Sequence, residues 1–208
     1  MAEENPDSMR PDTLKALMEF YQEQNQKVYS FGKSNEDMGE NWSLNQFWYT
    51  NECSDNIMDR VSKYSNSNQI KNIAIICAPS LYNSYKRKEE QFKDIQITLF
   101  EYDKKFSEFG KDYVFYDANE PLQIEKQYHH CYDMVIADLP FINEYFVKNV
   151  SETMRLLMKN ENTPIIYILG YQVKNFGLKE FTNLKCTDIE IKHNGLGNDF
   201  ELYSNVNL

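Results

Sequence analysis

The feature that most constrains the fold is an alternation of short apolar runs and helical stretches from about residue 70 onward. Five runs resemble strands, at 70–77, 95–101, 113–116, 132–137 and 164–169. They are continuously apolar rather than alternating, which is typical of parallel strands covered by helices on both faces. Helical stretches at 80–92, 103–108, 143–159 and 171–181 separate or follow them. This pattern predicts a doubly wound α/β sheet.

The two ends of the chain add to this core. Runs at 184–191 and 200–206 are joined by the glycine-rich stretch KHNGLGND, which predicts an antiparallel C-terminal hairpin. Residues 1–10 are expected to be a disordered tail, and 11–66 to be an N-terminal helical segment. Helical spacing of apolar residues supports two helices there, one through Leu14, Leu17, Met18, Tyr21 and Val28 and one through Ile57, Met58, Val61 and Tyr64. Residues 11–208 would then form a single domain with a sheet core at 67–208.

Composition excludes several classes of protein. Hydrophobic residues make up 41% of the 208 residues, enough for a sizeable core. No apolar run reaches the roughly 18 residues of a membrane span, and the acidic N-terminus does not resemble a secretory signal. The four cysteines are scattered, so neither a disulfide framework nor a metal site is expected. We expect a cytoplasmic protein with reduced thiols, and a monomer.

The net charge of −10 bears on partners. Such a charge repels a phosphate backbone and attracts a basic protein. A nucleic-acid partner is therefore disfavoured, although a local basic patch at 86–88 leaves that alternative open.

Acidic residues follow several predicted strands, and such sheets bind ligands at the carboxyl ends of their strands. Glu101, with Asp103 as a fallback, is placed to accept hydrogen bonds from ribose hydroxyls, and Asp117 from an adenine amine. The turn after the first strand has no GxGxxG loop, which argues against a dinucleotide and permits a ligand without phosphate, such as S-adenosylmethionine. Each acid alone could equally be a helix cap or a loop charge.

The stretch DLPF at 138–141 is a sharper signal. Pro140 fixes its own φ and keeps Leu139 out of helical conformation, so the chain leaves the strand in a rigid turn. That turn would present the Asp138 carboxylate and the Phe141 ring in a fixed relation, which suits an amine nucleophile. The alternative is an ordinary strand-to-helix turn with Asp138 as a cap.

Several motifs of the sequence resemble those of a known family. Residues 138–141 resemble the [DN]-P-P-[FY] signature of amino-methyltransferases, and NQFWYT, IICAPSLY, LFEYDKKF, VFYDANEP, DMVIADLPF and NDFELYSNV follow the order and spacing of the family labelled "probable N6-adenine methyltransferase". Its compact members are similar to eukaryotic lysine methyltransferases of translation elongation factor 1-alpha. The resemblance implies a seven-stranded class I (Rossmann-like) methyltransferase fold, with S-adenosyl-L-methionine as donor and S-adenosyl-L-homocysteine as product.

The same resemblance implies roles for residues. Those expected at the donor are Gln46, Phe47, Ala78, Pro79, Glu101 and Asp117, and those expected at the acceptor amine are Asp138, Pro140 and Phe141. Leu139 departs from the family's usual proline and restores a backbone N–H, and we expect the site to survive this change. Trp48 and Tyr49 fit core packing and donor contact equally well.

The sequence is compatible with three functions. The first is N-methylation of a lysine on a basic protein, with elongation factor 1-alpha implied by the resemblance; Asp138 would orient the amine rather than act as a strong base. The second is N6-adenine methylation of RNA or DNA, where Phe141 would stack on the base. The third is a binding module that kept the fold without the activity, for which Leu139 is the supporting feature.

Overall fold

The structure is a computed structural model, and it describes residues 47–208 except residues 140, 196 and 198. The predicted tail, the first predicted helix, Gln46 and Pro140 therefore lie outside the described residues. The sheet, helices and contacts given below are those of the described residues.

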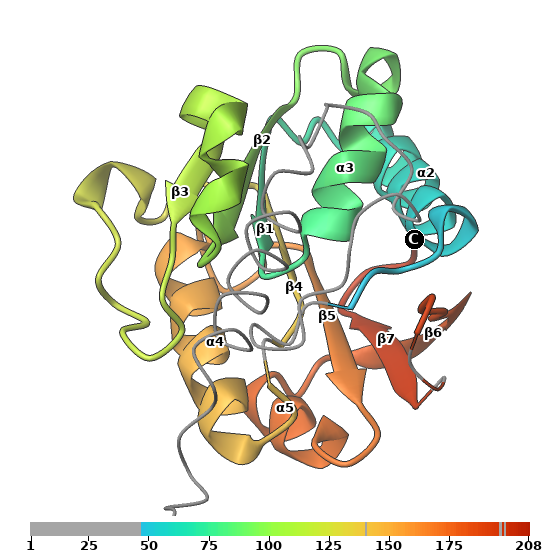
Figure 1. The fold of residues 1–208 in the computed structure, drawn as a ribbon, viewed down its shortest axis with the longest axis vertical. Coiled ribbons are helices and arrows are strands. Elements are labelled where there is room, and N and C mark those ends of the chain that lie inside the picture. Colours follow the sequence, from blue (N-terminus) through green and yellow to red (C-terminus); the bar gives the residue numbers. More distant parts are fainter. Residues whose placement is uncertain (1–46, 140, 196, 198) are drawn as a thin grey trace, which may run out of the picture. The chain divides into compact units, whose positions relative to one another are not determined.

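A seven-stranded sheet forms the centre, in the order β3-β2-β1-β4-β5-β7-β6. The strands β1 to β5 are parallel neighbours, whereas β7 runs antiparallel to both β5 and β6 (Figure 1). This confirms the predicted α/β fold class. The strand bounds are β1 (Asn72–Ile76), β2 (Gln96–Glu101), β3 (Tyr113–Phe115), β4 (Met134–Ala137), β5 (Ile165–Gly170), β6 (Lys185–Glu190) and β7 (Phe200–Ser204).

The C-terminal hairpin joins the sheet through its second strand, β7, which lies between β5 and β6. β7 pairs with β5 along its whole length, and β6 lies at the edge of the sheet. Burial explains the choice, because β7 ends in three buried residues while most of β6 is exposed. A strand with polar side chains on both faces is suited to an edge.

Helices cover both faces of the sheet. The helical elements are α2 (Asn51–Ser67), α3 (Pro79–Arg87), η3 (Glu89–Phe92), η4 (Lys104–Asp112), η5 (Lys126–Tyr128), α4 (Glu144–Leu157) and α5 (Lys174–Glu180). One core cluster joins α4 to one face of the strands, through side chains such as Val150, Met154, Ile76 and Tyr167, and includes no residue of α2 or α3. Those two helices contact each other and belong to the other layer (Figure 1).

Local sequence signals set the ends of these helices. Thr50 caps α2 by accepting a hydrogen bond from the Cys53 N–H, and Asn143 caps α4 by accepting one from Phe146. Pro79 occupies the first turn of α3, where its missing N–H costs nothing. The helix predicted over 80–92 is interrupted at Lys88, whose φ of −120° ends α3 before the short η3 begins.

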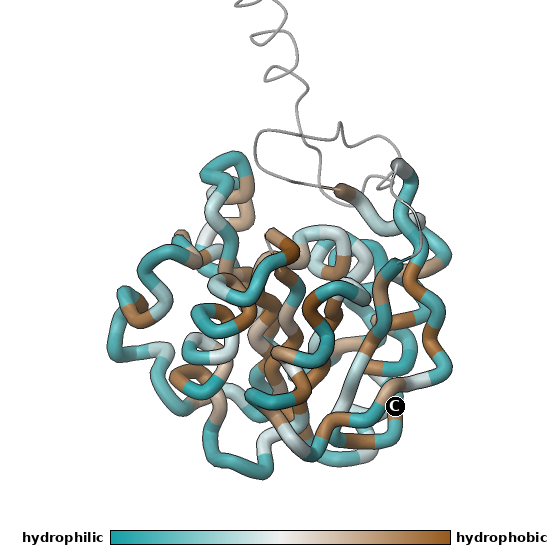
Figure 2. The backbone as a smooth tube through the Cα atoms, turned by 90° about the horizontal axis from the view of Figure 1, so that it is seen from below, coloured by the Kyte–Doolittle hydropathy of each residue, from teal (hydrophilic) through white to brown (hydrophobic). Residues whose placement is uncertain are grey.

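The register of the parallel strands aligns their carboxyl ends. Ile76 lies opposite Phe100 on one side and Ala137 on the other. The ladder continues one residue further, through hydrogen bonds from Cys77 N to Phe100 O (2.9 Å) and from Asp138 N to Ile76 O (3.0 Å). The residues that follow β1, β2 and β4 therefore lie side by side. Figure 2 shows that hydrophobic segments of the backbone gather in the interior of the described part, with hydrophilic turns around them.

Candidate active site

Glu101 ends β2 with its side chain buried, only 7% of it exposed. Its Oε1 accepts hydrogen bonds from the backbone N–H groups of Tyr102 (3.0 Å) and Asp103 (3.2 Å). Oε2 receives no hydrogen bond from the described part of the chain. Burial raises the pKa of Glu101 to about 7, against the opposing effect of the Asp103 N–H. Oε2 is therefore available to a hydrogen-bond donor of a ligand.

Asp138 follows β4 and is held at both carboxylate oxygens. Oδ1 accepts the backbone N–H of Leu139 at 2.7 Å, and Oδ2 accepts a hydrogen bond from the Tyr49 hydroxyl. Asn143, not Asp138, caps the following helix, so the alternative of Asp138 as a helix cap is wrong. Burial raises the pKa of Asp138 to about 7, and the bonds from Tyr49 and Leu139 oppose that rise. The carboxyl group therefore titrates close to neutrality.

Tyr49 is the partner that sequence reasoning left undecided. Its side chain is buried, its hydroxyl bonds to Asp138, and its backbone N–H donates to Ser80 Oγ at 3.2 Å. Burial and the negative charge of Asp138 raise the pKa of Tyr49 well above its usual value. Tyr49 therefore remains a hydroxyl donor and ties the segment before α2 to the ends of β1 and β4.

A short antiparallel bridge secures the same segment on its other side. Tyr49 pairs with His193, flanked by bonds from Thr50 N to Lys192 O and from Asn194 N to Trp48 O, each 2.9 Å. The His193 ring packs 4.8 Å from the Tyr49 ring, centre to centre. Burial lowers the pKa of His193 to about 4, so the ring is neutral at physiological pH.

Cys77 lies at the centre of this edge, directly after β1. Its φ of 53° is in the left-handed region, where the chain turns away from the strand toward α3. Burial raises the pKa of the Cys77 thiol well above its usual value, with further contributions from the negative charges of Glu101, Asp138 and Asp117. The half-buried Cys77 thiol therefore lies within reach of the charges of the predicted acids.

The turn after β4 begins with a buried side chain and continues with exposed ones. Leu139 is buried in the core cluster that contains Tyr167 and Val147, so its side chain is packed inward. Phe141 and Ile142 point outward and are exposed by 41% and 39%. Gly170, at the end of β5, lets Ile142 approach: a Cβ there would lie 3.0 Å from Ile142 Cγ2.

The remaining predicted acids are used by their own loops. Asp117 is half-buried, and its Oδ1 accepts hydrogen bonds from the backbone N–H (2.8 Å) and the side-chain amide (3.0 Å) of Asn119. It lies next to the Glu101 strand end, because Tyr116 N donates to Glu101 O. Asp103, the fallback for Glu101, caps η4 and pairs with Lys105 at 2.9 Å.

The arrangement can do two things chemically. At Glu101 it offers an oxygen, Oε2, that no described residue bonds and that suits hydroxyl donors of a ligand. It also offers, two strands away, a carboxyl group that can take or hold a proton near neutral pH. Strand order places β1, with Cys77 and the buried Ala78 and Pro79, between these groups.

Comparison with known proteins is decisive. The sequence profile of the family described as "Probable N6-adenine methyltransferase" matches residues 40–208. The chain belongs to this family. "EEF1A lysine methyltransferase 1" of Bos taurus is 32% identical over 98% of this chain and 89% of the relative. "Protein-lysine N-methyltransferase CG9154" of Drosophila melanogaster is 30% identical over 97% of this chain and 95% of the relative.

The chain is therefore a methyltransferase, and these near full-length relatives are protein-lysine N-methyltransferases. A third, "Protein-lysine N-methyltransferase EFM5" of Saccharomyces cerevisiae, is 30% identical over 95% of this chain and 91% of its own length. Among solved structures, the branched-chain polyamine synthase of Thermus thermophilus has a TM-score of 0.60 at 10% identity, over 89% of this chain. This chain spans 62% of that protein, and the likeness concerns the fold alone.

Within the methyltransferase fold, most of the predicted site residues gather at one edge. Glu101, Asp138, Ala78 and Pro79 come together there, and Asp117 lies beside Glu101. Phe47 is half-buried next to Trp48. Trp48 itself is buried, packs edge-on against Phe106 and has the Lys105 ammonium 5.2 Å from its ring.

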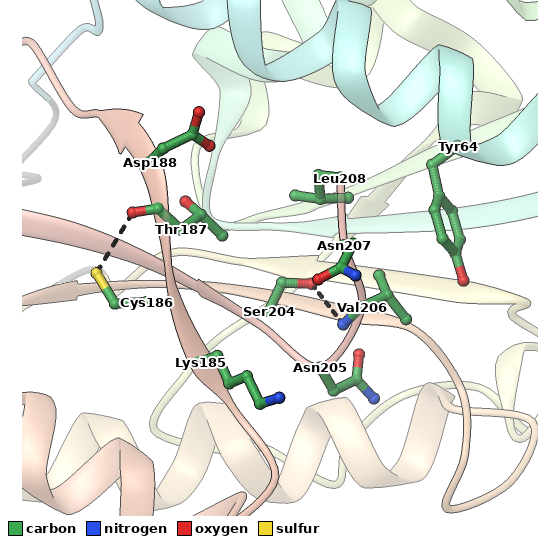
Figure 3. Close-up of a pocket in the computed structure, with 10 residues that line it drawn as sticks. All are labelled: Tyr64, Lys185, Cys186, Thr187, Asp188, Ser204, Asn205, Val206, Asn207 and Leu208. Atoms are coloured by element: carbon green, nitrogen blue, oxygen red, sulfur yellow. Dashed lines mark hydrogen bonds between the residues drawn. The ribbon is translucent and has the colours of Figure 1, made fainter.

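A polar cavity of about 640 Å³ lies at the opposite edge of the sheet, between β6, the C-terminal residues and α2 (Figure 3). Its lining residues are Tyr64, Lys185, Cys186, Thr187, Asp188, Ser204, Asn205, Val206, Asn207 and Leu208. Many of its polar groups already have partners. Asp188 forms a two-pronged ion pair with Arg60 (2.9 and 3.0 Å), and Asn205 bonds to the backbone of Ile165 and Thr163.

No helix among the described residues is long and apolar enough to cross a bilayer. Within the same residues, no group of His, Cys, Asp or Glu side chains is arranged to hold a metal ion.

Proposed function

We propose that the chain is an S-adenosyl-L-methionine-dependent protein-lysine N-methyltransferase that modifies translation elongation factor 1-alpha in the cytoplasm. The observation that carries the proposal is the Asp138 carboxyl group, which is held by Tyr49 and Leu139 beside the exposed Phe141. Relatives named for this substrate match nearly the whole chain. The four free cysteines fit a reducing compartment.

The donor side of the site fits S-adenosyl-L-methionine. Glu101 would accept from the ribose hydroxyls through Oε2, which receives no hydrogen bond from the described residues. Asp117 would lie toward the adenine, Ala78 and Pro79 against the donor, and Phe47 over its amino-acid end. When bound, the donor supplies a methyl group on a sulfonium centre.

The acceptor side must deliver a neutral amine. A free lysine has a pKa of about 10.4, so its nitrogen must lose a proton before it can attack. Burial of an ammonium lowers that pKa, and Asp138, whose own pKa is raised to about 7, is a better proton acceptor than an ordinary aspartate. Each oxygen of Asp138 has one partner and a further lone pair, so the carboxylate can still accept from the amine. The exposed Phe141 ring would contact the incoming cation.

Tyr49 and Leu139 act as positioning residues for Asp138. Each donates to a different oxygen, which fixes the plane of the carboxylate. Both bonds favour the charged form, which is the form that accepts a proton.

The test is transfer of a labelled methyl group from S-adenosyl-L-methionine to purified elongation factor 1-alpha, with the modified residue located by mass spectrometry. Label on a lysine supports the proposal. Parallel reactions with total RNA and with duplex DNA test the older family description. Label on adenine, with none on protein, would replace lysine with N6-adenine as the acceptor.

A further inference from the structure

Four exposed side chains with large apolar parts lie near the turn that carries Asp138. Phe141, Ile142, Tyr145 and Tyr171 are exposed by 41%, 39%, 53% and 64%. We call these four residues the acceptor rim. They come from two separate parts of the chain, the turn from β4 into α4 and the residue after β5.

Contacts join the acceptor rim into one surface. The rings of Phe141 and Tyr145 each pack on Phe146, at centre distances of 5.0 and 5.1 Å. Ile142 lies against Gly170, directly before Tyr171. The patch is therefore continuous from α4 to the end of β5, and it begins three residues after Asp138.

We propose that the acceptor rim docks the segment of a basic protein substrate that carries the target lysine. This proposal rests on the proposed function, and it assigns part of the affinity for the protein substrate to a particular surface. Exposed aromatic side chains gathered in one patch are unusual on a monomer and typical of protein interfaces, in which tyrosine contributes strongly to binding. Because the patch is continuous with the turn that carries Asp138, we assign it to binding of the methyl acceptor and not of the methyl donor.

Charge identifies the occupant as a basic partner rather than a second copy of this chain. The exposed acids Glu144 and Asp199 border the patch, Glu144 next to Tyr145 and Asp199 through its carbonyl bond to Tyr171 N (2.8 Å). Neither carboxylate forms an ion pair with a described residue. The ammonium of Lys174 lies 4.0 Å from the centre of the Tyr171 ring, and its charge is compensated by Glu201 at 2.9 Å. A net charge of −10 makes two copies repel each other and attracts a cationic segment.

The test measures steady-state kinetics of a Tyr145→Ser, Tyr171→Ser double variant on elongation factor 1-alpha. Neither residue touches the buried site, so donor affinity by calorimetry should stay unchanged. KM for the protein should rise about tenfold or more, since removing interface tyrosines has effects of this size. The slow rate on N-acetyl-lysine methylamide, which is too small to reach the rim, should not change.

The matched control is Leu122→Ser, which removes an exposed apolar side chain (59% exposed) from the β3–β4 connection. An unchanged KM in the double variant, or an equal rise in the control, would overturn the docking proposal. So would a rate on the small amine that falls in step with the rate on the protein. Wild-type enzyme that methylates neither the protein nor the small amine would instead overturn the proposed function.

Discussion

The carboxyl edge of the sheet and the cavity at its amino edge are both polar, yet their polar groups are used in opposite ways. In the cavity of Figure 3, Asp188 is paired with Arg60 and Asn205 is bonded to the backbone. At the carboxyl edge, one oxygen of Glu101 receives no hydrogen bond from the described residues, and burial raises the pKa of Glu101 and of Asp138 to about 7. Buried acids whose pKa values are raised toward neutrality are therefore a better sign of a site here than the presence of a polar cavity.

The largest contrast is expected from removing one carboxylate at each edge. Asp138→Asn keeps the shape of the side chain and removes its ability to take a proton, so the methylation rate should fall at least about a hundredfold. Asp188→Asn at the opposite cavity should change the rate less than about twofold. Rates of labelled-methyl transfer at saturating donor measure both. Equal losses in the two variants would remove the distinction between the edges.

The next contrast concerns stability. The pKa of Glu101 is 4.5 when exposed and about 7 in the fold, so between those values the folded protein binds the extra proton. The contribution of Glu101 to the free energy of unfolding therefore falls as the pH rises from about 5 to 8, by at most about 3 kcal/mol. Glu101→Gln should be more stable relative to wild type at pH 8 than at pH 5, as measured by urea unfolding.

The comparison with Glu101→Gln is needed because other groups titrate in the same window. His193, whose pKa is lowered to about 4, makes stability rise over part of that range and partly hides the effect in the wild type. A difference between Glu101→Gln and wild type that does not depend on pH would show that Glu101 is not held in its protonated form.

A smaller effect is expected on donor binding. Glu101→Gln retains an oxygen for the N–H groups of Tyr102 and Asp103 but loses the charge that would hold the ribose hydroxyls. Affinity for S-adenosyl-L-methionine should fall about tenfold, the usual scale for hydrogen bonds to a charged group. Titration calorimetry would measure it, with Asp188→Asn as the unaffected control. Full affinity in Glu101→Gln would place the donor elsewhere.

The smallest effect is a shift of the pH profile. Tyr49, the Cys77 thiol, the Tyr167 hydroxyl and the Leu139 N–H face Asp138, and the bond from Tyr49 lowers its pKa. Tyr49→Phe should raise that pKa above 7, so the acidic limb of the rate profile moves to higher pH, by about one unit or less. The rate should drop at pH 7 and recover at pH 9. A uniform drop at every pH would mean that Tyr49 only supports the fold.

Leu139 offers a matched pair for the same measurement. Leu139→Pro removes the N–H that bonds Asp138 Oδ1, whereas Leu139→Ala keeps it and only shortens the buried side chain. The proline variant should show the alkaline shift and the alanine variant should not. Identical profiles would show that the backbone bond has no influence on the acid.

Sequence reasoning reached the sheet and its acids because both depend on local pattern. Continuous apolar runs predicted β1 to β5, and parallel register then placed Glu101 and Asp138 at one edge. It did not find the bond from Tyr49 to Asp138, which joins residues 89 positions apart, or the bridge to His193. Such contacts depend on how loops return over the sheet, and apolar periodicity carries no information about that path. The aromatic run at 47–49 was the available signal, but buried aromatic residues serve cores as often as sites.

The surroundings of Cys77 bear on how the enzyme withstands oxidants. Oxidation and alkylation proceed through the thiolate, and burial among carboxylates keeps this sulfur protonated. Peroxide or a thiol-directed inhibitor should therefore react first at the exposed Cys186, far from the reacting groups. The acids at this edge of the sheet thus also slow the reaction of the Cys77 thiol with electrophiles.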